Sequence, residues 1–195
     1  MISRPHWFDR FPHGAGAQAV ACVWGLAEAT FFFIVPDVWL TVLGCRSIRA
    51  GLKAALAALL GALAGGLVMY SAGRTAPAST RAFVERVPGI QLGLIQKVEA
   101  DLTERGLAAV LLGPLRGVPY KIFAEEWGAR RGSWPAFLAV SIPARGTRFG
   151  VGVLLAGIVA RLIAPWTQRR ARTEMMILTA CWIAFYSVYF AKLGW

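Results

Sequence analysis

Six ionisable side chains lie within long apolar stretches of this chain. They are Glu28, Asp37, Arg116, Lys121, Arg145 and Arg148. A charge near the centre of a bilayer costs at least about 2.5–3.5 kcal/mol, so each of these residues calls for a cavity, a partner or a pathway. If they converge, two acids and four bases form a net positive cluster. Such a cluster suits an anionic group such as a phosphate, which arginine can bind through two parallel hydrogen bonds.

The individual residues allow more than one role. Glu28 and Asp37 could be counter-ions to the bases, or could take up and release protons. Asp37 follows a proline and could instead cap the next helix. Arg145 and Arg148 are three residues apart, so they share one face of a helix. They could bind an anion there, or extend to the membrane interface, as could Lys121. Glu28 could also serve only in structural pairing.

The composition indicates a membrane protein. Of the 195 residues 57% are hydrophobic and 16% are charged, whereas about a quarter are charged in soluble domains. The net charge of +11 would suggest a nucleic-acid partner in a soluble protein, but basic loops facing the cytoplasm explain it better. We therefore expect no nucleic acid. Known hydrolase and nucleotide-binding motifs and metal-ligand spacings are missing, so we expect neither an enzyme nor a bound metal or cofactor.

Apolar runs of sufficient length predict membrane spans. About 20 such residues cross the hydrocarbon, and three runs are predicted to do so: residues 54–73, 135–164 and 175–193. In the first run, Gly61, Gly65 and Gly73 recur at helical spacing. They leave one helix face smooth enough for close contact with another helix.

Two further apolar segments are broken by prolines. Residues 15–45 contain Pro36, and residues 106–124 contain Pro114 and Pro119. Proline removes a backbone donor, and broken backbone at membrane depth survives only where it faces protein or a watery cavity. These segments are therefore predicted to be re-entrant hairpins, which enter and leave the bilayer on one side.

Loop charges predict the orientation of these elements. If the hairpins enter from opposite sides, the cytoplasmic loops 46–53 and 161–174 each carry a net charge of +3. The outer loops carry less, with +1 for residues 74–105 and zero for residues 125–134. This bias agrees with the positive-inside rule, and two opposed hairpins are typical of an inverted repeat.

The two outer loops are predicted to differ in structure. Within residues 78–105, apolar residues recur at helical spacing, which predicts one amphipathic helix on the membrane surface or over the hairpins. They are Ile90, Leu94, Ile95, Val98 and Leu102. The second loop is predicted to be solvated, because Glu125 and Glu126 are followed by Arg130 and Arg131.

The order of these breaks resembles the DedA family, also called VTT or SNARE-associated membrane proteins, in its YqaA-like branch. The resemblance covers roughly residues 20–165 and rests on four stretches: Glu28 with Phe31-Phe32-Phe33-Ile34-Val35-Pro36-Asp37, then Gly61-x3-Gly65-x4-Tyr70-x2-Gly73-Arg74, then Pro119-Tyr120-Lys121-x2-Ala124, and Arg145-Gly146-x-Arg148-Phe149. The chain departs from the family pattern at Phe33 and Val35, where prolines are common, and at Trp127-Gly128 in place of Ala-Gly.

The resemblance implies a lipid-moving membrane protein. Members are associated with moving undecaprenyl phosphate or phospholipids between leaflets, in bacteria with proton coupling. Carried over by position, Glu28 and Asp37 would be the acidic functional residues, and Lys121, Arg145 and Arg148 the basic ones. Arg116 lies close to a basic position of the wider family.

Together, these observations predict a single all-α membrane domain over residues 1–195. It would have about three transmembrane helices, two opposed re-entrant hairpins and an amphipathic helix. We expect a multi-pass protein of the bacterial inner membrane, a proton-linked translocator of a lipid with an anionic head group. The alternative is a non-transporting scaffold that affects envelope integrity, with paired charges and a subunit contact through Gly61 and Gly65. A homo-oligomer is compatible with both hypotheses.

Overall fold

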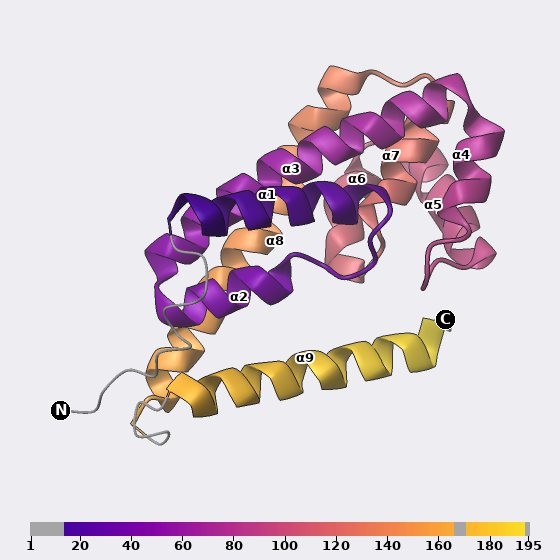
Figure 1. The fold of residues 1–195 in the computed structure, drawn as a ribbon. Coiled ribbons are helices and arrows are strands. Elements are labelled where there is room, and N and C mark those ends of the chain that lie inside the picture. The colour runs from indigo at the N-terminus through magenta and orange to yellow at the C-terminus, as the bar shows by residue number, and fades with distance from the viewer. Residues whose placement is uncertain (1–13, 166–170, 194–195) are drawn as a thin grey trace.

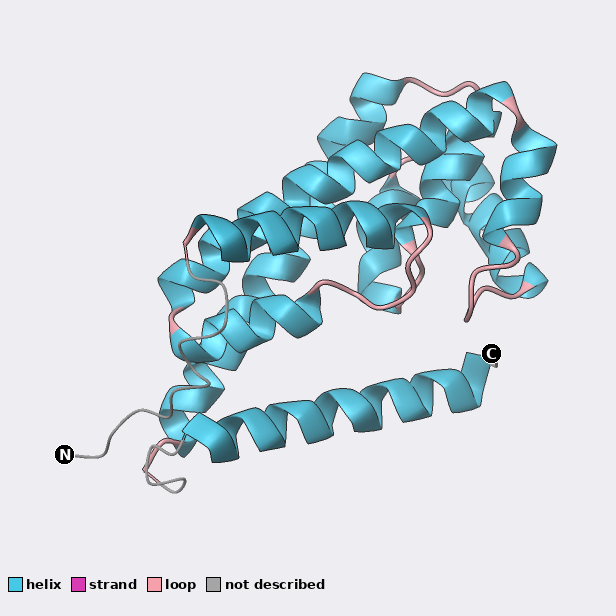
Figure 2. Ribbon diagram, viewed as in Figure 1, coloured by secondary structure: helices cyan, strands magenta, loops and turns pink. Residues whose placement is uncertain are grey.

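The computed structural model describes residues 14–165 and 171–193, and within these ranges its regular elements are helices without a strand (Figure 2). The predicted all-helical class is confirmed there. Arg169 and Arg170, which belong to the predicted cytoplasmic loop 161–174, lie outside the described residues. The elements are α1 (Ala15–Thr30), α2 (Asp37–Arg46), α3 (Ile48–Thr75), α4 (Pro77–Val84), α5 (Leu92–Arg105), α6 (Ala108–Leu112), the 3-10 helix η2 (Gly113–Arg116), α7 (Tyr120–Ala129), α8 (Trp134–Ile163) and α9 (Ala171–Leu193).

Two of these helices, α3 and α8, are long and apolar enough to cross a membrane. With 28 and 30 residues they extend about 42 and 45 Å, against about 30 Å of hydrocarbon. In α9 the apolar part, Met175–Ala191, is shorter. α3 begins before the predicted residue 54 because Ser47 caps it, accepting a hydrogen bond from the Ala50 N–H at 3.3 Å. These features suggest a membrane protein.

Each proline-broken segment consists of helices joined by a turn. α1 and α2 run antiparallel around residues 31–36 (Figure 1). The Trp24 Nε1–H donates to the Ile34 carbonyl at 2.9 Å, and the Trp39 Nε1–H donates to the Ala17 carbonyl at 3.1 Å. In the second segment, α6 and η2 are joined to α7 by residues 117–119. The two segments meet where Lys121, at the start of α7, donates to the Phe32 carbonyl in the first turn.

Prolines occupy the positions where these helices begin or change form. Pro36 and Pro119 are the residues immediately before α2 and α7, where a missing backbone N–H costs little. Pro114 lies within η2. Pro143, by contrast, lies inside α8, which continues through it. Pro143 therefore does not end the helix that forms the span predicted at residues 135–164.

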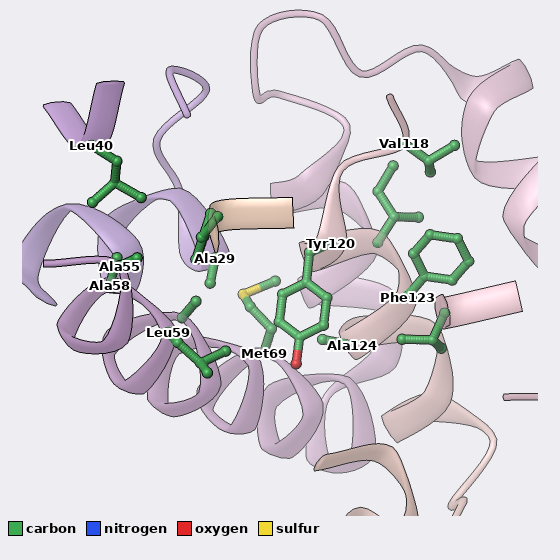
Figure 3. Packing of buried hydrophobic residues seen from close by; sticks show 14 of the residues in the cluster. Ala29, Leu40, Ala55, Ala58, Leu59, Met69, Val118, Tyr120, Phe123 and Ala124 are labelled. Carbon is green, nitrogen blue, oxygen red and sulfur yellow. The ribbon is translucent and has the colours of Figure 1, made fainter. Parts of the chain in front are cut away.

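The core forms around α3, which packs against α1, α7, α2 and α8. Its glycine face is covered within the same chain. A Cβ on Gly61 would overlap the Cys22 carbonyl of α1, and one on Gly65 would lie 2.7 Å from the Leu26 carbonyl oxygen. Gly73 faces the backbone of α7 in the same way. In Figure 3, buried side chains of these helices converge, with Tyr120 beside Met69. Gly61 and Gly65 therefore do not form the exposed subunit contact that the scaffold hypothesis would use.

The amphipathic helix predicted from Ile90 to Leu102, within the connector at residues 78–105, corresponds to α5. The structure has α4 and α5, separated by residues 85–91. The break contains Pro88 and Gly89, and Gly89 has a φ of +79° that favours glycine. Ile95, Val98 and Leu102 are nevertheless buried together, because α5 packs on α6 and α7.

The loop predicted at residues 125–134 is also corrected. α7 continues to Ala129, and Glu125 and Glu126 are buried at 2% and 9% exposure. Packing of α7 against α3, α4 and α5 covers these carboxylates. Their burial depends on contacts that are distant in sequence, which a local charge pattern does not report.

Candidate functional site

Two ion pairs link the first proline-broken segment to α8. The Arg145 guanidinium donates to the Glu28 carboxylate, and Arg148 Nη2 donates to Asp37 Oδ2 at 3.1 Å. Glu28 and Arg145 are 4% and 1% exposed, so this pair is shielded from solvent inside the molecule. The four charged residues predicted on these elements therefore lie together as two acid–base pairs.

Aromatic rings hold the Arg145 guanidinium in place. Its central carbon lies 4.6 Å from the centroid of the Tyr120 ring and 5.0 Å from that of Phe149, within the range of cation–π attraction. Tyr120 is fixed in turn, because its hydroxyl donates to Ser141 Oγ at 2.8 Å. Arg145 is thus packed inside the protein and does not extend to the interface.

Lys121 joins the two proline-broken segments. It lies on α7 and is 2% exposed. Its Nζ donates to the Phe32 carbonyl, in the turn between α1 and α2, at 2.9 Å. Like Arg145, Lys121 is held in the interior, and the interface role considered for it is wrong for this structure.

Asp37 occupies the first turn of α2. Its carboxylate accepts a hydrogen bond from Arg148. A negative charge in this first turn still favours the helix through its dipole. Asp37 therefore combines a favourable place at the start of α2 with an ion pair to α8.

Arg116 differs from the other five residues. It is exposed at the end of η2 and makes no ion pair with any residue that the structure describes. It nevertheless lines the same cavity as Glu28, Lys121 and Arg148. A cation held by no carboxylate is available to an incoming anion.

The cavity itself has a volume of about 310 Å³. Its charged lining comprises one carboxylate, Glu28, and three bases, Arg116, Lys121 and Arg148. Asp37 and Arg145 do not line it, but pair with residues that do. The cavity is therefore net positive, with two guanidinium groups and an ammonium group that can bind phosphate oxygens.

One wall of the cavity comes from α9, through Phe185, Tyr186 and Tyr189. The Val35 N–H donates to the Tyr186 hydroxyl at 2.8 Å. These residues are not among the site residues predicted from the sequence, since aromatics near the end of an apolar helix are also typical of a membrane interface. The sequence of α9 alone does not distinguish a residue of the cavity wall from one at the membrane interface.

No protein-family model, curated protein or solved structure matches the chain. What the site can bind therefore follows from its own chemistry. Within the described ranges, no group of three or more His, Cys, Asp or Glu residues could hold a metal ion. The chemistry present is that of an aromatic-lined, basic cavity.

A second charged cluster lies beyond the proline-broken segments, where Glu125 and Glu126 face α4 and α5. The Arg130 Nε–H donates to Glu126 at 2.9 Å, and Arg81 pairs with Glu99. Glu125 is left with a carboxylate oxygen that no hydrogen bond satisfies. Its burial, with a further contribution from Glu126, raises the pKa of Glu125 from 4.5 to about 7.

This raised pKa predicts a pH-dependent effect of Glu125→Gln. The folded protein holds the Glu125 proton more tightly than the unfolded chain does, so the stabilisation is complete below about pH 4.5 and is lost as pH rises through 7. Glutamine does not ionise, so the variant does not lose this stabilisation as pH rises. At pH 8 the variant should be more stable than wild type by roughly 2 kcal/mol, with the difference vanishing near pH 4.

Thermal unfolding in detergent at pH 4, 6 and 8 measures this difference. Glu104→Gln is the matched control, because Glu104 is exposed on α5. A constant difference between wild type and Glu125→Gln at all three pH values would contradict the prediction.

Proposed function

We propose that this chain is an integral membrane protein of the DedA type that moves a phosphate-bearing lipid between leaflets. The cargo class includes undecaprenyl phosphate and phospholipids, and the protein acts as a transporter and not as an enzyme. The observation that carries the proposal is the net positive cavity lined by Glu28, Arg116, Lys121 and Arg148. A cavity with that lining is suited to an anionic head group.

The arrangement of the cavity supports this cargo. Arginine side chains can hold two phosphate oxygens at once, while Lys121 adds a compact point charge. Glu28 keeps part of the positive charge balanced when no anion is bound. Because Glu28 offsets part of the positive charge, the cavity binds an anion less tightly than the three bases alone would. A site that must also release its cargo needs this moderation, because binding that is too strong would prevent movement.

The proposed topology has three spans, α3, α8 and α9, and two re-entrant hairpins, residues 15–45 and 106–124. Arg49 and Lys53 from one predicted cytoplasmic loop and Arg161 from the other line a common surface depression. Their proximity supports placing both loops on the same side of the membrane. With the positive-inside rule this gives a multi-pass protein of the bacterial inner membrane, either as one chain or as a homo-oligomer.

Proton linkage is proposed for the two buried carboxylates, Glu28 and Asp37. Each is paired with an arginine of α8. Protonation of Glu28 would neutralise the one carboxylate among the cavity's charged lining residues, and protonation of Asp37 would release Arg148, which also lines the cavity. Either change would favour an anion there, and deprotonation would reverse it. Proton movement is coupled in this way to binding of the head group.

Reconstitution into liposomes tests the proposal directly. Movement of fluorescent phosphatidic acid or polyprenyl phosphate between leaflets is followed by chemical quenching from outside, with and without a pH gradient. Wild type should accelerate this movement in a gradient-dependent manner. Arg116→Gln should slow it about tenfold, the loss expected for one charge-assisted hydrogen bond. The amount of folded protein should stay unchanged, because Arg116 makes no ion pair with the residues that the structure describes.

Arg161→Gln is the matched control, since it removes an exposed arginine outside the cavity and should leave the rate at the wild-type value. Equal rates for Arg116→Gln and wild type would contradict the role of the cavity. Absence of any protein-dependent movement with wild type would favour the scaffold hypothesis.

A further inference from the structure

A second, larger cavity lies between the first proline-broken segment and α9. Its volume is about 630 Å³ and its lining is mostly apolar. The turn contributes Phe33 and Ile34, α2 contributes Val38 and Val42, and α9 contributes a stripe of residues from Leu178 to Ala191. The stripe spans 14 residues of helix, so the groove is roughly 20 Å long.

The apolar groove and the basic cavity meet at two aromatic residues. Phe33 and Tyr186 line both of them. The two rings come from opposite sides, one from the turn and one from α9. A ligand with a charged head and an apolar tail can therefore lie across this junction, with each part in matching surroundings.

α9 forms one wall of this groove and packs mainly against α2. In Figure 1, α9 runs beside α2 and apart from the other helices, and its closest packing is with α2. Its polar links to the rest of the chain include Tyr186 with Val35 and the Trp182 Nε1–H donating to Thr41 Oγ1 at 3.0 Å. The Phe33 and Phe190 rings touch edge to face, with centroids 5.5 Å apart.

From this continuity we infer that the groove between α2 and α9 binds the hydrocarbon chain of the lipid whose phosphate occupies the basic cavity. The inference rests on the proposed function and extends it, since it makes chain length a determinant of recognition. Methylene groups leave water or solvating lipid for a fitted apolar surface, while the phosphate stays with the three bases. A short-chain phosphate would use the basic cavity alone.

Filling the groove away from the junction tests this inference. Thr179→Trp, on α9, and Val42→Phe, on α2, each add bulk to the lining. Binding of farnesyl phosphate and of the short isopentenyl phosphate is measured by calorimetry on the full chain in nanodiscs of zwitterionic lipid. Each variant should weaken binding of farnesyl phosphate about tenfold, because displacing two methylene groups has an effect of that size. Binding of isopentenyl phosphate should not change.

Ala180→Trp is the matched control, because Ala180 is exposed on the same helix but does not line the groove. It should bind both probes as wild type does. Unchanged farnesyl phosphate binding in the two groove variants, or equal weakening for both probes, would overturn the inference and leave the basic cavity standing. If wild type binds neither probe, the proposed function itself fails.

Discussion

Replacing Arg145 by methionine is expected to lower the free energy of unfolding by about 3–5 kcal/mol, the usual cost of leaving one partner of a buried ion pair alone. Arg145 is 1% exposed and pairs with Glu28, which is 4% exposed. Methionine matches the length of the arginine stem but leaves the Glu28 carboxylate without its nearest cation. The contacts of the guanidinium with Tyr120 and Phe149 are lost as well.

The double variant Glu28→Gln/Arg145→Met separates pairing from packing. It removes both charges, so it should be destabilised by clearly less than the sum of the two single variants. Arg161→Met, an exposed change in the same helix, should cost little. Unfolding in mixed detergent micelles provides the free energies. Additive costs would mean that the pair contributes nothing beyond its separate side chains.

Replacing Gly61 by alanine is the second large expected effect, with a loss of about 3 kcal/mol. A Cβ at this position would overlap the Cys22 carbonyl, and one at Gly25 would overlap the Ala58 carbonyl. The obstacle is rigid helix backbone on both sides, so α1 and α3 must separate. Overpacking of this kind typically costs 1–3 kcal/mol, and more where the neighbour cannot move.

Gly150→Ala provides the matched control for helix propensity. Gly150 lies within α8, and a Cβ there would have no atom within 4 Å apart from its own helix and chain neighbours. Alanine should be neutral or stabilising there by up to about 1 kcal/mol. Thermal unfolding compares the two substitutions. Equal stability of Gly61→Ala and Gly150→Ala would show that α1 and α3 are not packed as closely as described.

The prediction of helices from sequence succeeded where a signal is local. The apolar runs at residues 54–73 and 135–164 predict long helices, and both runs lie almost entirely within α3 and α8. The helical pattern from Ile90 to Leu102 corresponds to α5, whereas α4 and the turn at Pro88-Gly89, a common turn signal, were not predicted. The prediction of a solvated loop at residues 125–134 was wrong, because Glu125 is buried by α4 and α5, which pack over α7.

The sequence by itself determined which residues were candidates for the site. Charged residues within the apolar stretches of residues 15–164 are candidates because inserting a charge in a membrane is costly. Only the tertiary structure decided their partners, because Glu28 and Arg145 are 117 residues apart and meet through the packing of α1, α3 and α8. The same packing, with α9 alongside, brings Phe33 and Tyr186 to the junction of a basic and an apolar cavity. Local patterns report the cost of a buried charge, while the fold determines what compensates it.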